Sequence, residues 1–336
     1  MPLVMKPYAE RTPDTQYKNL LKTIRENGER DKAPQGVDTF SVFAPPHLRF
    51  ELNENGFPVI TERKIGFWRQ PIGEICAFIN GVDTVEGLLQ FGCRYWQSWA
   101  DSPYAKEMNL KPRELGPGSY GPAFHDFPMP APDTNAVING IIALLNEPDG
   151  GVIHREKITD SLNKIRTGTF DQFKHLVEQI KEFPFLKTHL VTPWIPYYTV
   201  RGEGKKRRVI VAPCHGWIFV RILNEKINLF MLQRSADILV GVPSNFLQYS
   251  ALALMLAHLT GYERAVYVHG FVDAHIYENQ FGYVEEVLAR TPRPFPTLSL
   301  TDEGRAVTDI HDFRHEHFTL SDYNPHPAIS GIPVAP

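Results

Sequence analysis

Hydrophobic and polar positions change period along the chain, and the change predicts a mixed α/β fold. Tyr17–Glu26 places apolar side chains at helical spacing and ends before an Asn-Gly helix stop. Thr39–Leu52 indicates two short strands separated by a pair of prolines. Ile72–Ile79 is an apolar helical run in which Glu74 is the lone carboxylate.

Strand patterns dominate after Pro184. β-rich segments separated by turns or loops are predicted at Leu190–Val191, Val209–Val211, Trp217–Leu223 and Ile227–Leu232. Phe246–Leu259 is typical of a buried helix, and Ala265–Phe271 of a buried strand. The predicted strands lie far apart, and no internal repeat with a period of about 20–50 residues occurs. We therefore expect a single domain over residues 1–336.

The pattern loosens between residues 122 and 185. This stretch holds three closely spaced prolines, a helix predicted near Ala136–Leu145 and a charged segment from His154 to Lys181. Stretches of this kind are commonly surface insertions or lids. We predict an insertion here, more solvated than the rest of the chain.

Composition and charge exclude several classes of protein. With 336 residues, 43% hydrophobic and 22% charged, the chain can bury a large core, which excludes a disordered chain, a collagen-like fibre and a coiled coil. The net charge of −3 argues against DNA or an anionic membrane as partner. The N-terminus has no signal-like apolar region, and three cysteines without a C-x-x-C pair fit a reducing compartment. A soluble cytoplasmic protein is expected.

The sharpest local signal is Ala-Pro-Cys-His at residues 212–215, which the pattern places at the end of a β-rich segment. A thiol attacks as the thiolate, so its pKa of about 8.5 must be lowered by a nearby cation or donor. Arg234 and His215 are candidates for this task. The alternative is a structural Cys214 beside a turn-forming His215, because neighbours on a strand point to opposite sides.

Residues 233–245 add a candidate phosphate-binding pair and two side chains that can hydrogen-bond to a heterocyclic ring. Arg234 and Ser235 offer a charged fork and a hydroxyl suited to phosphate. Asp237 can accept a hydrogen bond from a ring N–H, and the amide of Asn245 matches a pyrimidine edge that presents a donor and an acceptor. Taken alone, these residues are more often a surface ion pair and a loop amide.

The segment after Phe271 carries a third group of polar residues. His275 and Tyr277 stand two apart, so in an extended chain they share a face and can reach one sugar hydroxyl. Asp273 and His275 also look like a fragment of a metal site. No further histidine or carboxylate follows at ligand spacing, so we expect no metal.

Together these strings resemble the thymidylate synthase family. The resemblance is carried by APCH (212–215), QRSADILVGVPSN (233–245), DAHIYEN (273–279), RTPRPFPTL (290–298) and the C-terminal YNPHPAISGIPVAP. The N-terminal half agrees more loosely, as in IGEICAFINGVDT (72–84) and YWQSWAD (95–101). Residues 122–185 and 197–208 fall outside the resemblance and are predicted insertions. The family implies an α/β (α+β) fold, with a large mixed sheet, flanking helices and a homodimer packed through the sheets.

The resemblance implies transfer of a one-carbon unit from 5,10-methylenetetrahydrofolate to carbon 5 of a pyrimidine nucleoside monophosphate. By position, Cys214 attacks carbon 6 and Glu74 is the general acid/base, whose place in an apolar run fits a raised pKa. Tyr120 and His215 match residues that support the water network. The tail Pro333–Pro336 would fold over the bound pair.

The remaining implied roles concern binding. The nucleotide would be held by Gln233, Arg234, Ser235, Asn245 (base), His275 and Tyr277 (sugar), with Lys187 reaching the phosphate from a partner subunit. The folate would be held by Asp237, Gly241, Trp96 and Trp99.

Several phosphate-binding arginines of the family are missing. Gly36–Thr39 aligns with the family's Arg-Thr-Gly-Thr loop, and Lys187-Thr188 aligns with its arginine pair. The string at Arg166–Thr169 is interpreted as chance, because the expected strand does not follow it. The basic run Lys205–Arg208 is either replacement charge or a solvated loop. Ala123–His125 stands where the family has Gln-Trp-Arg.

These departures predict a specialised relative. Hydroxymethylation of carbon 5 is slightly favoured over the reductive methylation of a thymidylate synthase. Asn245 favours uracil, since relatives that act on cytosine often carry Asp there, so a CMP or dCMP hydroxymethylase is the weaker alternative. A non-catalytic regulator that binds nucleotide or RNA, and a Cys-His hydrolase, are the remote alternatives.

Overall fold

The protein is described by a computed structural model covering residues 5–33, 36–100, 104–129, 134–145, 168–202, 204 and 206–334. Within these residues, one mixed sheet has the strand order β1-β2-β9-β8-β7-β6, and β3 also pairs with β9. Its strands are β1 (Glu29–Asp31), β2 (Thr39–Phe43), β3 (Leu48–Glu51), β6 (Leu190–Val191), β7 (Trp217–Leu223), β8 (Lys226–Asp237) and β9 (Glu263–Tyr277). The predicted mixed α/β fold is confirmed.

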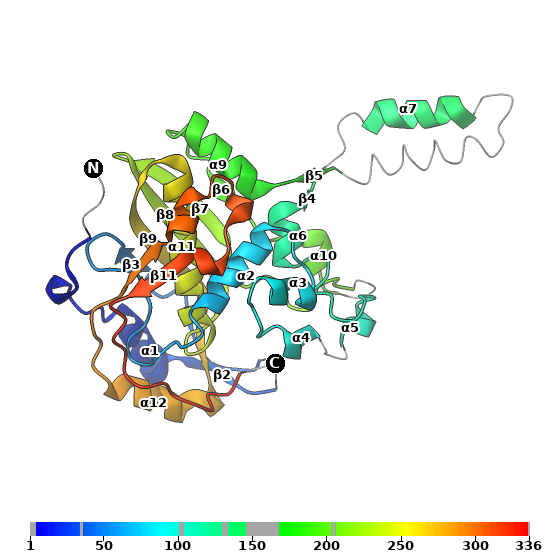
Figure 1. Cartoon of the computed structure of the whole chain (residues 1–336). Helices are drawn as coiled ribbons and strands as arrows, with labels where there is room; N and C mark the ends of the chain where they lie inside the picture. The colour runs from blue at the N-terminus through cyan, green and yellow to red at the C-terminus, as the bar shows by residue number, and fades with distance from the viewer. Residues whose placement is uncertain are drawn as a thin grey trace.

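Helices cover one face of this sheet, as Figure 1 shows for α2, α9 and α11. Two short strand pairs lie apart from it: β4 (Phe127–Pro128) with β5 (Thr169–Phe170), and β10 (Thr297–Leu300) with β11 (Phe318–Ser321). The α-helices are α1 (Gln16–Asn27), α2 (Arg69–Ile79), α3 (Val85–Gln90), α4 (Gln97–Ala100), α5 (Tyr104–Glu107), α6 (Tyr120–His125), α7 (Thr134–Leu145), α9 (Gln172–Glu182), α10 (Pro196–Thr199), α11 (Gly241–Thr260), α12 (Phe281–Ala289) and α13 (Asp302–Ala306). The 3-10 turns are η1 (Tyr8–Glu10), η2 (Glu278–Gln280), η3 (Ile310–Asp312) and η4 (His315–His317).

The parallel pair β8–β9 is the centre of the sheet and brings two of the predicted site segments together. The helix α11 connects these two strands and is buried along nearly its whole length. Their register places Ser235 opposite Asp273, and Asp237 opposite His275. The second and third polar groups found in the sequence therefore lie side by side at the carboxyl ends of two neighbouring strands.

Two of the predicted strands differ in the structure, because a strand depends on the partner with which it pairs. No strand forms at Val209–Val211, where Ile210 instead donates one backbone hydrogen bond to Leu115 O at 2.9 Å. Cys214 therefore lies in a loop before β7, rather than at the end of a strand as predicted. The buried strand predicted to end at Phe271 continues to Tyr277, because β2 pairs with its last residues.

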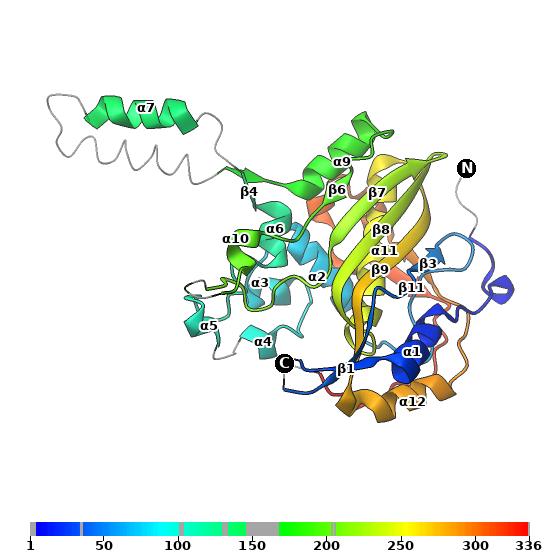
Figure 2. The same ribbon diagram turned by 180° about the vertical axis from the view of Figure 1, so that it is seen from behind.

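The first predicted insertion divides into two parts with different packing. The helix α9 packs Phe173, Leu176 and Ile180 into the core, so it is less solvated than the sequence indicated. By contrast, α7 lies away from the rest of the molecule, beyond the β4–β5 pair (Figures 1 and 2). The string at Arg166-Thr167 lies outside the described residues.

Candidate active site

Cys214 lies in the loop before β7 and is held between two side chains. Its backbone N–H donates to Tyr120 Oη at 2.7 Å, and Arg234 Nη2 donates to its Sγ at 3.5 Å. The side chain is partly exposed, whereas Cys76 and Cys93 are buried. Of the three cysteines, Cys214 is thus the one placed to meet a ligand.

The charges around Cys214 identify the cation that can stabilise a thiolate. Burial raises the pKa of Cys214, the Arg234 guanidinium lowers it, and the Asp273 carboxylate raises it. Burial also lowers the pKa of His215 to about 3, so this ring is neutral at pH 7. Of the two cations suggested by the sequence, Arg234 fits the task and His215 does not.

The rings of Tyr120 and His215 build the wall behind Cys214. Tyr120 begins α6, and its ring stacks on Phe78 of α2 at 4.7 Å and on His215 at 4.6 Å. His215 Nδ1 lies 2.6 Å from Tyr249 Oη, within hydrogen-bonding distance. These contacts fasten the Cys214 loop to α2 and α11.

Glu74 is a buried carboxylate surrounded by hydrogen-bond donors. It lies in α2 with 4% of its surface exposed. Its oxygens accept hydrogen bonds from Tyr95 Oη at 2.6 Å, from Trp96 Nε1 and from Gln248 Nε2. Burial raises the pKa of Glu74 to about 7, while these three donors act in the opposite direction. A carboxyl group with this pKa can give or take a proton near neutral pH.

A buried chain of hydrogen bonds connects Glu74 with Asn245. Gln248 Nε2 donates to Glu74, and Asn245 Nδ2 donates to Gln248 Oε1 at 2.8 Å. The Glu74 carboxylate sets the orientation of both amides. It accepts a hydrogen bond from the NH2 group of Gln248, and this leaves Gln248 Oε1 facing Asn245, where it accepts from Asn245 Nδ2. Asn245 therefore keeps Oδ1 as an acceptor for a ligand.

The residues predicted to bind the phosphate end of the nucleotide differ in how they are placed. Arg234 lies 5.6 Å from the ring centroid of Trp194 and donates to the backbone oxygen of Pro213 at 3.3 Å. Ser235 follows it in β8 and is partly exposed. Gln233 is buried, with Oε1 2.8 Å from His269 Nε2, so its side chain faces the interior.

The groups predicted for the sugar and the folate meet at the end of β9. His275 Nδ1 lies 2.7 Å from Asp273 Oδ2, and the rings of His275 and Tyr277 pack edge to face at 5.3 Å. Asp237 Oδ2 accepts a hydrogen bond from Gln280 Nε2 at 3.1 Å. Gln280 Nε2 also donates to Pro333 O at 3.1 Å, which ties the C-terminal tail to this edge of the site.

The family of the chain follows from its match to a known protein family. The sequence pattern described as Thymidylate synthase matches residues 15–335. The chain belongs to the thymidylate synthase family. Enzymes of this family transfer a one-carbon unit from methylenetetrahydrofolate to carbon 5 of a pyrimidine nucleotide, so the chain is a one-carbon transferase that binds nucleotide and folate.

Not every residue carried over from the thymidylate synthase family lies at the site. Gly241 begins α11 near Asn245, and Trp96 is bound to Glu74. Lys187 is exposed on the loop before β6, without an ion pair among the described residues. The side chain of Trp99 and the residues Lys205, Ala335 and Pro336 lie outside the described parts of the chain.

Sequence reasoning missed four polar residues that complete this thymidylate synthase-like site: Tyr95, Gln248, Tyr249 and Gln280. Gln248 and Tyr249 were visible as polar interruptions in an apolar helix. Gln248 also stands three residues after Asn245, which places both on one helix face. That spacing is the signal that would have found it.

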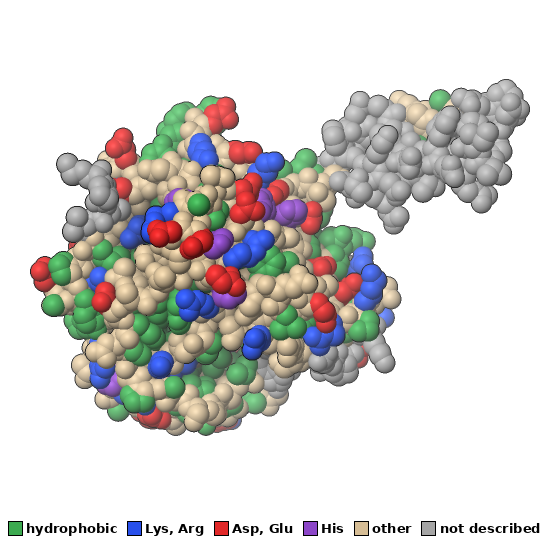
Figure 3. All heavy atoms as spheres, in the orientation of Figure 1, with side chains coloured by type: hydrophobic (Ala, Val, Ile, Leu, Met, Phe, Trp, Pro, Cys, Tyr) green, Lys and Arg blue, Asp and Glu red, His purple; other side chains and the backbone are tan. Residues whose placement is uncertain are grey.

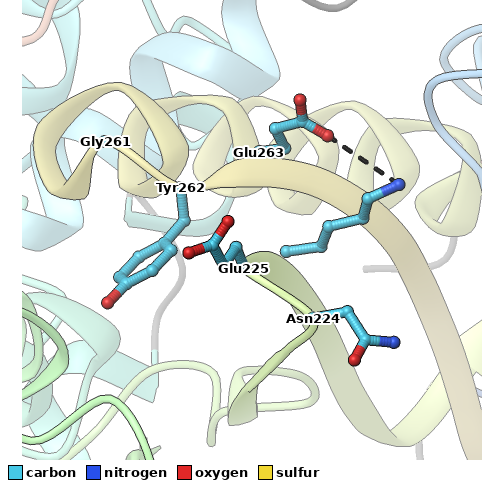
Figure 4. A pocket seen from close by; sticks show the side chains of 6 residues that line it. Asn224, Glu225, Gly261, Tyr262 and Glu263 are labelled. Atoms are coloured by element: carbon cyan, nitrogen blue, oxygen red, sulfur yellow. Dashed lines mark ion pairs between the residues drawn. The ribbon is translucent and has the colours of Figure 1, made fainter. Parts of the chain in front are cut away.

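Two surface pockets lie away from these residues. One is lined by the β7–β8 turn and the end of α11, where Lys226 Nζ and Glu263 Oε2 form an ion pair at 3.8 Å (Figure 4). The other adjoins it along α11 and β10. Neither is lined by a predicted site residue. Within the described residues, no helix is both long and apolar enough to cross a membrane.

Proposed function

We propose that this protein hydroxymethylates carbon 5 of a uracil nucleoside monophosphate. In this proposal Cys214 adds to carbon 6, carbon 5 takes the methylene unit from methylenetetrahydrofolate, and Glu74 receives the carbon-5 proton through water. Tetrahydrofolate leaves, water adds to the exocyclic methylene carbon, and Cys214 is expelled. The net change replaces one hydrogen by CH2OH.

The chain from Asn245 through Gln248 to Glu74 is the observation that carries the proposal. Hydride transfer in a thymidylate synthase requires that water stay away from the reactive methylene group. Here Glu74 accepts hydrogen bonds from Gln248 and Tyr95, and with its raised pKa it can take a proton from the water molecule that adds to the methylene carbon. The missing phosphate arginines also support a specialised enzyme rather than a thymidylate synthase.

Mass analysis of the products tests the reaction. The protein is incubated with methylenetetrahydrofolate and, separately, with UMP, dUMP, CMP and dCMP. We expect a gain of CH2O on a uracil nucleotide with tetrahydrofolate released. A gain of CH2 with dihydrofolate formed would identify a thymidylate synthase instead. A gain on a cytosine nucleotide only would overturn the base assignment, and no gain with any of the four would overturn the activity.

The preference for uracil rests on the orientation of Asn245. Asn245 Nδ2 donates a hydrogen bond to Gln248, so Asn245 Oδ1 remains as an acceptor for the base. Uracil has an N3–H group that can donate to this oxygen, whereas N3 of cytosine carries no hydrogen. The second Nδ2 proton can serve the carbonyl oxygen of uracil. Both hydrogen bonds suit uracil.

We expect Asn245→Asp to reverse the preference between the two bases. A carboxylate facing Gln248 Oε1 repels it, so kcat/KM for the uracil nucleotide should fall about 10–100-fold. The ratio of cytosine to uracil turnover should rise. Competition between the two nucleotides in one reaction measures that ratio. An unchanged ratio would show that Asn245 does not read the base.

We also propose that the protein is a homodimer packed through the open face of the sheet. Seen from behind, β7, β8 and β9 have no helix over them in the part of the chain that the structure describes (Figure 2). Leu190 and Phe219 are register partners on this face and are 45% and 40% exposed. Lys187 lies just before β6 at the same edge, so a partner sheet would bring it toward the other subunit's nucleotide.

The substitution Phe219→Asp is expected to separate the dimer. A carboxylate buried between two sheets is costly, so the dissociation constant should rise at least about 100-fold. Light scattering after gel filtration measures the mass. Ile138→Asp is the matched control, since Ile138 is 43% exposed on α7, away from the sheet. If the wild-type chain is a monomer at micromolar concentration, the dimer proposal fails.

A further inference from the structure

Three potential metal ligands meet at the base of the β4–β5 hairpin. His125 ends α6, Asp171 is the N-cap residue of α9, and His311 lies in η3. One ligand atom from each lies within 4.8 Å of the others. Figure 3 shows histidine and acidic side chains gathered on the surface near this hairpin. None of the three belongs to the proposed active site.

The distances suit a small cation. Asp171 Oδ2 lies 2.8 Å from His311 Nε2 and 3.7 Å from His125 Nε2. Two ligand atoms on a tetrahedral zinc ion, each bonded at about 2.0–2.2 Å, stand about 3.3 Å apart. Both distances lie within about half an ångström of that separation, and the ligand atoms of His125 and His311 lie within 4.8 Å of each other, so side-chain rotations would have to draw the two histidines together around the ion.

The three residues use other atoms for their contacts with the rest of the protein, so the atoms that would bind the ion stay available. His311 Nδ1 is hydrogen-bonded to Asp309 Oδ1 at 2.7 Å, whereas His125 Nδ1 lies 3.2 Å from Asp126 Oδ1 without forming a hydrogen bond. A carboxylate on the far nitrogen of a histidine is the usual support of a zinc ligand. Asp171 uses Oδ1 to accept the Lys174 N–H at 2.9 Å, which leaves Oδ2 for the ion.

The nitrogen that would face the ion is shielded from solvent. His311 Nε2 is buried, and the neighbouring polar atom is Asp171 Oδ2 at 2.8 Å. A cation bound between these two atoms would take the place of their direct contact.

We propose that His125, Asp171 and His311 bind a divalent first-row transition metal ion, with Zn²⁺ as the ion to test and water in the fourth position. Two imidazoles and one carboxylate suit this class better than Mg²⁺ or Ca²⁺, which prefer all-oxygen sites. The ion would join both strands of the hairpin to η3. It would also steady α6, whose first residue is Tyr120. The sequence indicated no metal, because its ligands come from three distant segments.

Zinc titration of the chelator-treated full chain against a chromogenic chelator tests the site. We expect one tight equivalent in the wild-type protein, lost in His311→Ala and in His125→Ala. Asp309→Asn should bind about 10–100-fold more weakly, since it removes only the outer support. His175→Ala, an exposed histidine on α9, and Cys214→Ala should each keep the full equivalent.

Thermal unfolding gives a second measurement. Zn²⁺ should raise the unfolding temperature of the wild-type chain and of His175→Ala, but not that of His311→Ala. If the cluster is only a His–Asp ion pair, the wild-type chain binds no tight equivalent and Zn²⁺ shifts none of the unfolding temperatures. Either result, or an equivalent retained in His311→Ala, overturns the proposal.

Discussion

Cys214→Ala is expected to abolish turnover, with a loss of about 10⁴-fold or more. The substitution removes the thiol beside Arg234 that adds to the pyrimidine ring in the proposed reaction, and no water in its place can form the same covalent bond. Release of tritium from carbon-5-labelled nucleotide is the sharpest measurement, because this exchange needs the thiol and the acid/base group but no completed transfer. The loss should appear in exchange and in product formation alike.

Cys76→Ala is the matched control for this variant. Its thiol is buried in α2, so the change removes a cysteine without reaching the ligand site. Exchange should continue in Cys76→Ala. If Cys214→Ala exchanges tritium at the wild-type rate, the catalytic assignment is wrong. A regulator that only binds nucleotide would show no exchange in the wild-type protein either.

Glu74→Gln is expected to lower the exchange rate about 10²–10⁴-fold. The amide keeps the shape of the side chain but neither gives nor takes a proton. Because the pKa of Glu74 is raised to about 7, the wild-type rate should change around neutral pH, and the variant should lose this dependence. Rates measured from pH 5 to pH 9 distinguish this loss from a merely structural defect. The matched control is Glu62→Gln, since Glu62 is also buried and its pKa is also raised by burial.

The same variant should change how stability depends on pH. Burial raises the pKa of Glu74 above its ordinary value of 4.5, so between these two values the folded chain holds a proton that the unfolded chain has released. This contribution to stability is present at low pH and is lost as the pH rises through 7. The free energy of unfolding of Glu74→Gln relative to wild type should therefore rise by about 2 kcal/mol from pH 5 to pH 8. Urea unfolding at both values measures it, and parallel curves would contradict the raised pKa.

Local patterns in the sequence predicted most elements because they depend on neighbours. The apolar spacing of Tyr17–Glu26 reports which helix face is buried, and the mostly apolar run Phe246–Leu259 predicts a helix buried on all sides; α1 and α11 confirmed both. The strand predicted at Val209–Val211 was wrong for the opposite reason. A strand needs a partner, and the residues around Leu115 offer one hydrogen bond instead of a ladder.

Short strings along the chain were enough to predict the family, the reactive residue types and the mixed α/β fold, because each string meets strict chemical demands. How those residues act on one another depends on their packing in three dimensions. Burial raises the pKa of Glu74 against the opposite effect of its hydrogen bonds from Gln248 and Trp96. His125 meets His311 only because α6 and η3 both pack against α2 and α9. Electrostatics and coordination depend on distance in space, and periodicity along the chain does not report which distant surfaces will meet.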